Sequence, residues 1–210
     1  MALSKIDVAN MLTGEVPNAN VATIGVAKGG TGLTSGTTNQ FLKFTGSTTL
    51  ASAADNAGIT TASIWRVTSN FDGDADPIAS NWEEMDAPTG YGELGSNITQ
   101  SSGIFTFPET GIYSISYTIM LYNDSATGRS VHNIKTTHDN STYALAAGAA
   151  CFCDSGYLQS STCHTLFDVT NVTTHKCQFE INQVTNNGNG LLTGTDYNYT
   201  YVQFIRLGDT

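Results

Sequence analysis

The stretch from Gly111 to Asn123, "GIYSISYTIMLYN", constrains the fold of this chain more than any other segment. Large apolar side chains occupy every second position, and short hydroxyl side chains lie between them. The alternating positions are Tyr113, Ile115, Tyr117, Ile119 and Leu121 against Ser114, Ser116 and Thr118. A period of two is typical of a β-strand with one buried face. We therefore predict a long strand whose Tyr113, Ile115 and Tyr117 lie in a sandwich core or at a trimer contact.

Similar alternation recurs in segments that Gly, Asn and Asp clusters separate. Residues 103–107 precede the long strand and are joined to it by "PETG", in which proline ends a ladder, so we expect a hairpin. Further strands are expected around Trp65 and Ile134 and in 142–153, 157–169, 175–184 and 197–207. The sequence predicts an all-β fold, an antiparallel β-sandwich of the jelly-roll or immunoglobulin-like kind.

The composition of the chain changes near residue 62. All nine tyrosines and both tryptophans follow that point, whereas residues 1–61 are rich in Gly and Thr. We expect an extended N-terminal attachment arm over 1–61 and a jelly-roll head over 62–210. The arm holds too few apolar residues to fold alone, so those that it has need a partner surface. The expected anchors are Ile6, Val8, Val21, Val26, Leu33, Phe41 and Leu42.

The charge of the chain limits its partners. The net charge is −10, and no Lys or Arg occurs between Arg66 and Arg129. A protein that binds nucleic acid needs a basic footprint, so we expect no nucleic-acid partner. No apolar run is long enough to span a membrane, and "MALSKIDVAN" lacks the apolar core of a secretory signal. We therefore expect that the chain is made in a cytoplasm and does not insert into a membrane.

Two segments of the head carry a resemblance to a known superfamily. The stretches "GIFTFPETGIYSISYTI" and "LTGTDYNYTYVQFIRLG" resemble a hairpin and the final strand of the tumour necrosis factor and complement globular-head superfamily. Gln203 departs from that pattern, because the superfamily often has glycine there, and no collagen-like repeat lies upstream. The resemblance implies a jelly-roll head over roughly residues 64–208.

The arm resembles a different group of proteins. The stretch "KGGTGLTSGTTNQFLKFTGSTTLASA" is similar to a repeat of bacteriophage tail fibres and other virion surface proteins, in which a glycine-rich turn leads into a short strand. The upstream "LTGEVPNANVATIG" also looks like their linking segments. Members of both resembled groups are usually trimers, so the resemblances imply a homotrimer at a virion surface, made in the host cytoplasm.

Three alternating carboxylates form a candidate metal site. Asp72, Asp74 and Asp76 lie in "FDGDADP", and Glu83 falls where the last ligand of an EF-hand loop would lie. Pro77 replaces the glycine that the EF-hand turn requires, and no flanking helices are evident. The segment therefore has two interpretations, a solvated acidic loop and a Ca²⁺ site. We expect no other cofactor.

The cysteines allow three interpretations. Cys151 and Cys153 would share one strand face, and histidines lie beside two of the other cysteines, as a zinc site requires. The spacing matches no known zinc ribbon or finger, and a cytosol disfavours disulfides. We expect buried free thiols, with a disulfide or a metal site as the alternatives. The residues concerned are Cys151, Cys153, Cys163, Cys177, His164 and His175.

Catalytic signatures are scarce in the sequence. No nucleophile elbow, zinc-protease motif or phosphate-binding loop occurs. Glu83, Glu84 and Asp86 could supply a glycosidase pair, but glycan-degrading spikes are normally longer and built as β-helices. We therefore expect a protein that is not an enzyme.

The aromatic residues near the C-terminus have a structural and a functional interpretation. Tyr197, Tyr199 and Tyr201 alternate, so on an inner sheet they would fill the sandwich core or meet their copies at a threefold axis. The alternative is that exposed tyrosines stack on carbohydrate.

These features favour a trimeric capsid decoration or cement protein of a phage. Its arm would bind a major capsid protein or neighbouring subunits, and its head would project outward. The first alternative is a short tail-fibre or fibre-tip adhesin that binds a host surface glycan or receptor. The second is a calcium-dependent ligand-binding module of the same fold.

Overall fold

The computed structural model describes residues 40–44, 50–53, 58–86, 93–123, 128–183 and 189–210. The chain divides into two compact units, Met1–Ala57 and Gly58–Thr210. In the first unit, β1 (Phe41–Phe44) pairs antiparallel with β2 (Leu50–Ala53), with Phe44 opposite Leu50. The division of the chain into an arm over 1–61 and a head over 62–210 stays a prediction.

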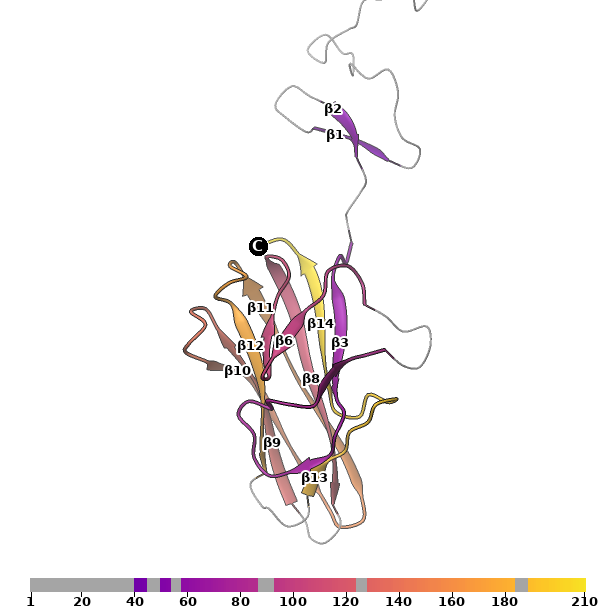
Figure 1. Ribbon diagram of the computed structural model, residues 1–210, viewed down its shortest axis with the longest axis vertical. Helices are drawn as coiled ribbons and strands as arrows, with labels where there is room; N and C mark the ends of the chain where they lie inside the picture. The colour runs from indigo at the N-terminus through magenta and orange to yellow at the C-terminus, as the bar shows by residue number, and fades with distance from the viewer. Residues whose placement is uncertain (1–39, 45–49, 54–57, 87–92, 124–127, 184–188) are drawn as a thin grey trace, which may run out of the picture. The chain divides into compact units, whose positions relative to one another are not determined.

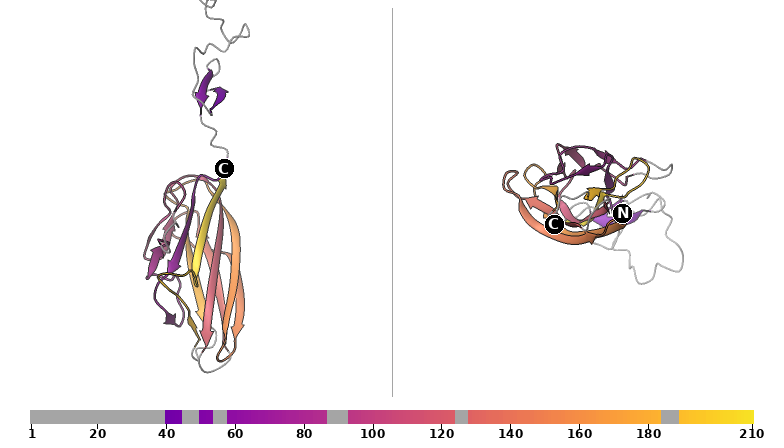
Figure 2. Two further views of the ribbon diagram at one scale, coloured as in Figure 1. Left: turned by 90° about the vertical axis from the view of Figure 1, so that its right-hand side faces the viewer. Right: turned by 90° about the horizontal axis from the view of Figure 1, so that it is seen from below.

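The second unit, called the head from here on, is built from two antiparallel sheets (Figure 1; end-on in Figure 2). The smaller sheet has the order β10 (Ala144–Cys153), β9 (Gly128–Thr137), β12 (Lys176–Gln183), β7 (Ile104–Thr106), β6 (Thr99–Ser101). The larger sheet has the order β4 (Phe71–Asp72), β13 (Asn189–Leu191), β8 (Gly111–Asn123), β14 (Tyr201–Gly208), β3 (Ala62–Val67), β5 (Trp82–Glu84). On its other side β8 pairs with β11 (Leu158–Val169). The predicted all-β antiparallel sandwich is confirmed.

Strand β8 lies at the centre of the larger sheet, between β11 and β14. Its burial alternates strictly along the strand, as the sequence alternation requires. Tyr113, Ile115 and Tyr117 are fully buried between the sheets, so they belong to the sandwich core and not to a contact between copies. The hydroxyl side chains between them lie half-exposed on the opposite face of the sheet.

The core between the sheets is aromatic at its centre. Phe105 of β7 is fully buried, and its ring centroid lies 5.1 Å from that of Trp82 and 5.2 Å from that of Phe179. Phe204 of β14 lies 5.4 Å from the same ring, so both sheets contribute to the contact. Edge-to-face aromatic pairs of this kind add about 0.5–1.5 kcal/mol each beyond the area that they bury.

The predicted hairpin between residues 103–107 and the long strand is wrong. Strand β7 pairs with β6 and β12 of the smaller sheet, whereas β8 belongs to the larger sheet. The "PETG" segment is instead a corner that carries the chain from one sheet to the other. The Tyr113 hydroxyl donates a hydrogen bond to the Glu109 carbonyl across this corner, at 3.0 Å. The rings of Phe107 and Tyr113 pack at 4.7 Å on its core side.

The prediction that Tyr197, Tyr199 and Tyr201 lie on one strand and fill the core is also wrong. Strand β14 begins at Tyr201, and the two earlier tyrosines lie in the preceding loop with their ring centroids 5.8 Å apart. Tyr197 is exposed and the other two are half-buried, whereas Val202 and Phe204 fill the core from β14. The contact at a threefold axis remains a prediction for these tyrosines.

Candidate functional site

The outer face of the larger sheet, which points away from the core, presents short hydroxyl side chains at its centre. Strand pairing aligns residues of β3, β14, β8 and β11 in rows across this face. We call it the hydroxyl face. Its rows are Arg66–Tyr201–Thr118–Thr162, Ile64–Gln203–Ser116–His164 and Ala62–Ile205–Ser114–Leu166.

Charge is absent from the centre of the hydroxyl face. Strand β8 contains no charged residue between Gly111 and Asn123. The Thr118 and Thr162 hydroxyl oxygens lie 2.8 Å apart, so part of the hydrogen-bonding capacity of this face is satisfied internally. The core of a protein interface is depleted in charged residues, and the centre of this face matches that property.

A second uncharged surface lies along one side of the head. Strands β10 and β11 each end a sheet, and they lie against each other along their length. No charged residue occurs from Tyr143 to Cys153, and the small side chains of β10 are exposed. An unprotected edge strand offers unpaired backbone groups to another chain. We call this surface, formed by β10 with Leu158 and Leu166 of β11, the free edge.

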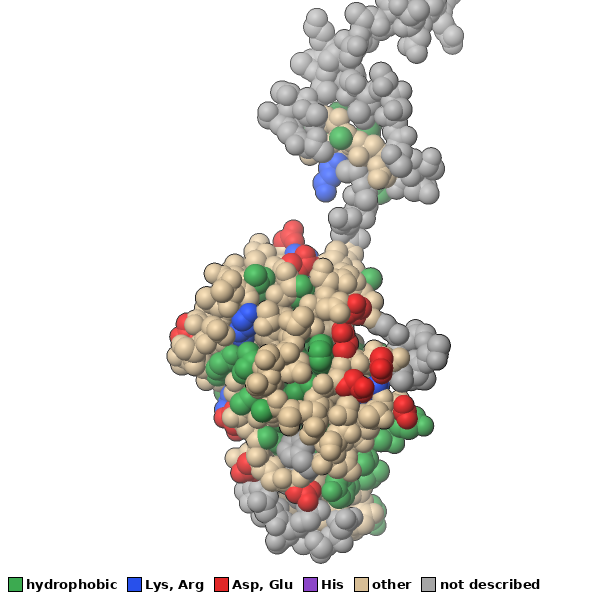
Figure 3. Space-filling view, in the orientation of Figure 1, with side chains coloured by type: hydrophobic (Ala, Val, Ile, Leu, Met, Phe, Trp, Pro, Cys, Tyr) green, Lys and Arg blue, Asp and Glu red, His purple; other side chains and the backbone are tan. Residues whose placement is uncertain are grey.

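One buried arginine borders the hydroxyl face. The Arg66 side chain is fully buried and donates to the Glu83 carboxylate at 2.9 Å and to the Asp86 carboxylate at 2.6 Å. Glu84 lies apart from this ion pair, and burial, followed by the nearby Glu93, raises the pKa of Glu84 to about 7. Acidic side chains gather on this side of the head (Figure 3). The glycosidase alternative needs carboxyl groups that face a substrate, but two of the three neutralise an internal cation.

The three aspartates of the candidate calcium loop do not converge. The Asp72 carboxylate accepts a hydrogen bond from the Tyr122 hydroxyl at 3.3 Å. The Asp76 carboxylate accepts from the Gln178 amide at 2.8 Å and pairs with Lys135. Among the residues that the structure describes, no three His, Cys, Asp or Glu side chains are placed to hold a metal ion. The Asp72 and Asp76 carboxylates therefore have separate partners, and the calcium interpretation of Asp72, Asp74 and Asp76 stays a prediction.

All four cysteines are buried thiols in the core region. Burial raises the pKa of Cys151 and of Cys163 to about 11, so these thiols stay protonated at neutral pH. The Cys153 thiol donates to the Tyr157 carbonyl at 3.0 Å. These cysteines act as small apolar side chains and hydrogen-bond donors.

The arm anchors are only partly within the described residues. Phe41 and Leu42 of β1 are exposed, as is Phe44. Ile6, Val8, Val21, Val26 and Leu33 lie outside the described residues.

The sequence analysis missed several surface residues that the fold brings together. The free edge and the turn between β10 and β11 received no functional interpretation, although the charge-free run from Tyr143 to Cys153 was a visible signal. The exposed apolar positions of β11 at Leu158 and Leu166 also alternate with its buried ones.

No known family profile matches the chain, and a search of curated proteins found no match. Solved structures do match. The crystal structure of murine APRIL at pH 5.0 aligns with a TM-score of 0.51 at 11% sequence identity, over 70% of this chain and 98% of that one. The head is a jelly roll of the tumour necrosis factor type. The structure of murine APRIL at pH 8.5 aligns over the same shares of the two chains, with 11% identity and a TM-score of 0.46.

This likeness confirms the jelly-roll fold that was predicted from the sequence of the segments around β8 and β14. At this identity the likeness concerns the fold alone. None of the described residues forms a helix that is long and apolar enough to cross a membrane.

Proposed function

We propose that this chain is a structural protein of a bacteriophage virion, a trimeric capsid decoration or cement protein that is not an enzyme. The arm binds the major capsid protein or neighbouring subunits at the virion surface, and the head projects outward. One observation carries the proposal, namely the exposed apolar side chains of the hairpin of the arm.

The hairpin of β1 and β2 exposes large apolar side chains on both of its faces. Phe41, Leu42 and Phe44 are 63%, 57% and 64% exposed. An isolated two-stranded hairpin is marginally stable in water, so this one needs a surface to cover it. Burying a large apolar side chain contributes about 1.5–3 kcal/mol, and three of them would offset much of the ordering cost. The resemblance of this segment to virion surface proteins supports a capsid protein or a neighbouring subunit as the partner.

The two uncharged surfaces of the head support self-association. A head-to-tail contact joins two different surfaces of the same chain, and it closes into a ring when the rotation between copies allows. The hydroxyl face and the free edge are such a pair. We take three copies from the resemblances of the sequence. A trimer presents three arms, so weak individual arm contacts multiply into firm attachment.

The test compares substitutions within the hairpin of the full-length chain. The double variant Phe41→Ser with Leu42→Ser should be lost from purified particles, while its head remains folded by circular dichroism. Lys43→Gln, which lies on the same strand and keeps both apolar side chains, should remain bound. Particle binding by the double variant at the level of the unmodified chain would overturn the anchoring role.

A short tail-fibre adhesin is the second candidate function. Exposed apolar side chains at the turn between β10 and β11 favour it, because they are available to a ligand. Copy number separates the two candidates. Gel densitometry of purified particles should give copies on the scale of the major capsid protein for a decoration protein. Copies on the scale of tail proteins would replace the decoration role with the fibre role.

A further inference from the structure

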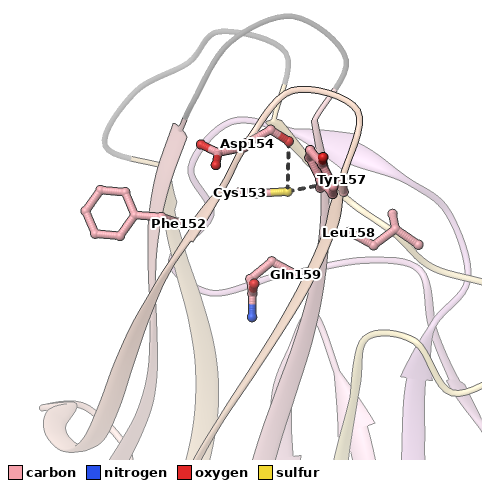
Figure 4. A pocket seen from close by; sticks show the side chains of 6 residues that line it. All are labelled: Phe152, Cys153, Asp154, Tyr157, Leu158 and Gln159. Atoms are coloured by element: carbon pink, nitrogen blue, oxygen red, sulfur yellow. Dashed lines mark hydrogen bonds between the residues drawn. The ribbon is translucent and has the colours of Figure 1, made fainter.

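The residues of the turn between β10 and β11 line a small cavity that is open to solvent at one end of the head. Within the head, the C-terminus lies at the opposite end (Figure 1). The cavity has a volume of about 220 Å³ and is lined by Phe152, Cys153, Asp154, Tyr157, Leu158 and Gln159. Figure 4 shows Phe152 and Leu158 on opposite sides of Cys153. Sites for drug-sized ligands span roughly 300–1,000 Å³, so this cavity suits a smaller ring.

The turn is held in one conformation by buried groups. The Asn123 side-chain amide donates to the Cys153 carbonyl at 2.8 Å, and both residues are nearly fully buried. The Gly156 amide donates to the Asn123 carbonyl at 2.8 Å, and the Tyr157 amide donates to the Asp154 carbonyl at 3.1 Å. Gly156 has a φ of 80°, in the left-handed region that glycine adopts without strain. The backbone of this turn is therefore preorganised, which lowers the entropic cost of binding a ligand.

The rigid turn presents apolar and polar groups side by side. Tyr157 is 69% exposed and Phe152 is 64% exposed. Gln159 carries amide donors and an acceptor, and its Nε2 donates to the Ser160 carbonyl at 3.1 Å. Asp154 adds a carboxylate at the rim. An exposed aromatic ring and a planar amide on one turn fit a ligand that has an apolar face and an edge of hydroxyl groups.

We propose that this turn is a binding site for a neutral saccharide. The C–H face of a pyranose ring packs on the exposed aromatic side chain of Tyr157. The hydroxyl groups at its edge exchange hydrogen bonds with the Gln159 amide. An acidic sugar is disfavoured, because the chain carries a net charge of −10.

The experiment is saturation-transfer difference NMR on the full-length chain. The ligands are the methyl glycosides of glucose, galactose, mannose and N-acetylglucosamine, with N-acetylneuraminic acid as the anionic comparison. We expect at least one neutral glycoside to receive saturation at its ring protons, while the anionic sugar receives none. Tyr157→Ala should raise the apparent dissociation constant by at least about tenfold, whereas Tyr157→Phe should retain binding. Gln159→Ala should weaken binding without removing the aromatic contact.

The matched control is Tyr197→Ala. Tyr197 is a similarly exposed tyrosine, at 64%, in the loop before β14. Its substitution should leave the dissociation constant unchanged. Absence of binding by all four neutral glycosides would overturn the proposal, and so would unchanged binding by Tyr157→Ala. Loss of binding in Tyr197→Ala alone would assign the saccharide to the C-terminal tyrosines instead. All of these measurements use the isolated chain, so their failure is distinguishable from failure of particle attachment.

Discussion

His138 Nδ1 lies 2.9 Å from His175 Nε2, although 37 positions separate the two residues in the chain. The rings are perpendicular, with centroids 4.5 Å apart. The Thr170 hydroxyl lies 3.1 Å from His175 Nε2, and the Thr174 hydroxyl lies 3.1 Å from His175 Nδ1. Both nitrogens of His175 thus have partners in its neutral form, and a proton on each histidine would place two positive charges in contact.

This pair predicts acid destabilisation of the head. Burial, followed by the positive charge of His138, lowers the pKa of His175, against the opposing effects of Asp168 and the Asn171 backbone. A histidine whose pKa is lower in the folded state contributes stability above its unfolded pKa of about 6.5 and loses it as the pH falls. The free energy of unfolding can be measured by urea titration at pH values on both sides of about 6.5. It should decline as the pH falls below about 6.5. In His138→Gln the decline should be shallower. A stability that rises on acidification would contradict this account.

A second histidine adds to the same slope. His132 is fully buried beside Tyr117, with ring centroids 5.2 Å apart, and burial lowers the pKa of His132 to about 4. Neither ring nitrogen has a hydrogen-bond partner among the described residues. His132→Phe should leave the free energy of unfolding at neutral pH unchanged or higher, because it removes buried polar atoms and keeps the ring. At about pH 5 the variant should exceed the unmodified chain by about 2 kcal/mol. Equal acid slopes for the two proteins in urea titrations would refute this role.

Much of the fold was predictable because strand periodicity is local. The alternation in 111–123 gave β8 and its buried face directly. Which strands pair is a long-range property, and "PETG" reads equally as a hairpin turn and as the corner that the structure has. The same limit applies to Tyr197 and Tyr199, whose alternation imitates a strand although the chain is still in a loop there.

The candidate surfaces were less predictable than the strands. The hydroxyl face combines rows from four strands, and the ion pairs of Arg66 depend on residues 17 and 20 positions away. The carboxylates of "FDGDADP" are adjacent in sequence, yet the hydrogen bond from Gln178 to Asp76 spans 102 positions. Sequence proximity suggested a shared metal, whereas tertiary pairing gives these carboxylates separate partners.

The buried ion pair of Arg66 should contribute more stability than the partly exposed one of Lys135. Arg66→Ala removes a fully buried cation and leaves Glu83 and Asp86 without it. Because these carboxylates are partly solvated, we expect a loss of about 1–3 kcal/mol, below the usual cost of breaking a buried pair. Lys135→Ala, which loses its pairs with Asp76 and Glu180, should cost about 0–1 kcal/mol. Chemical denaturation measures both losses, and an equal or reversed order would contradict the assignment.

Gly103 should tolerate a side chain less well than Gly73. Both have a positive φ, of 79° and 98°. A Cβ at Gly103 would lie 2.2 Å from the Ile78 carbonyl oxygen, whereas at Gly73 it would meet nothing within 4 Å. Gly73→Ala should therefore cost only the conformational strain of about 1–2 kcal/mol. Gly103→Ala should lower the free energy of unfolding by clearly more, because the backbone at Ile78 must move to make room for the side chain. Urea denaturation measures both losses, and equal losses would show that the contact with Ile78 is easily relieved.

The mass of the full-length chain in solution tests self-association through the hydroxyl face and the free edge most directly. Light scattering coupled to size-exclusion chromatography should give three times the chain mass of 22.2 kDa. Ser116→Arg, which places a charge at the centre of the hydroxyl face, should give a single chain mass. Asn182→Arg, at an exposed position of β12 in the smaller sheet, should leave the trimer intact. A single chain mass for the unmodified protein, or a trimer that survives Ser116→Arg, would contradict the account.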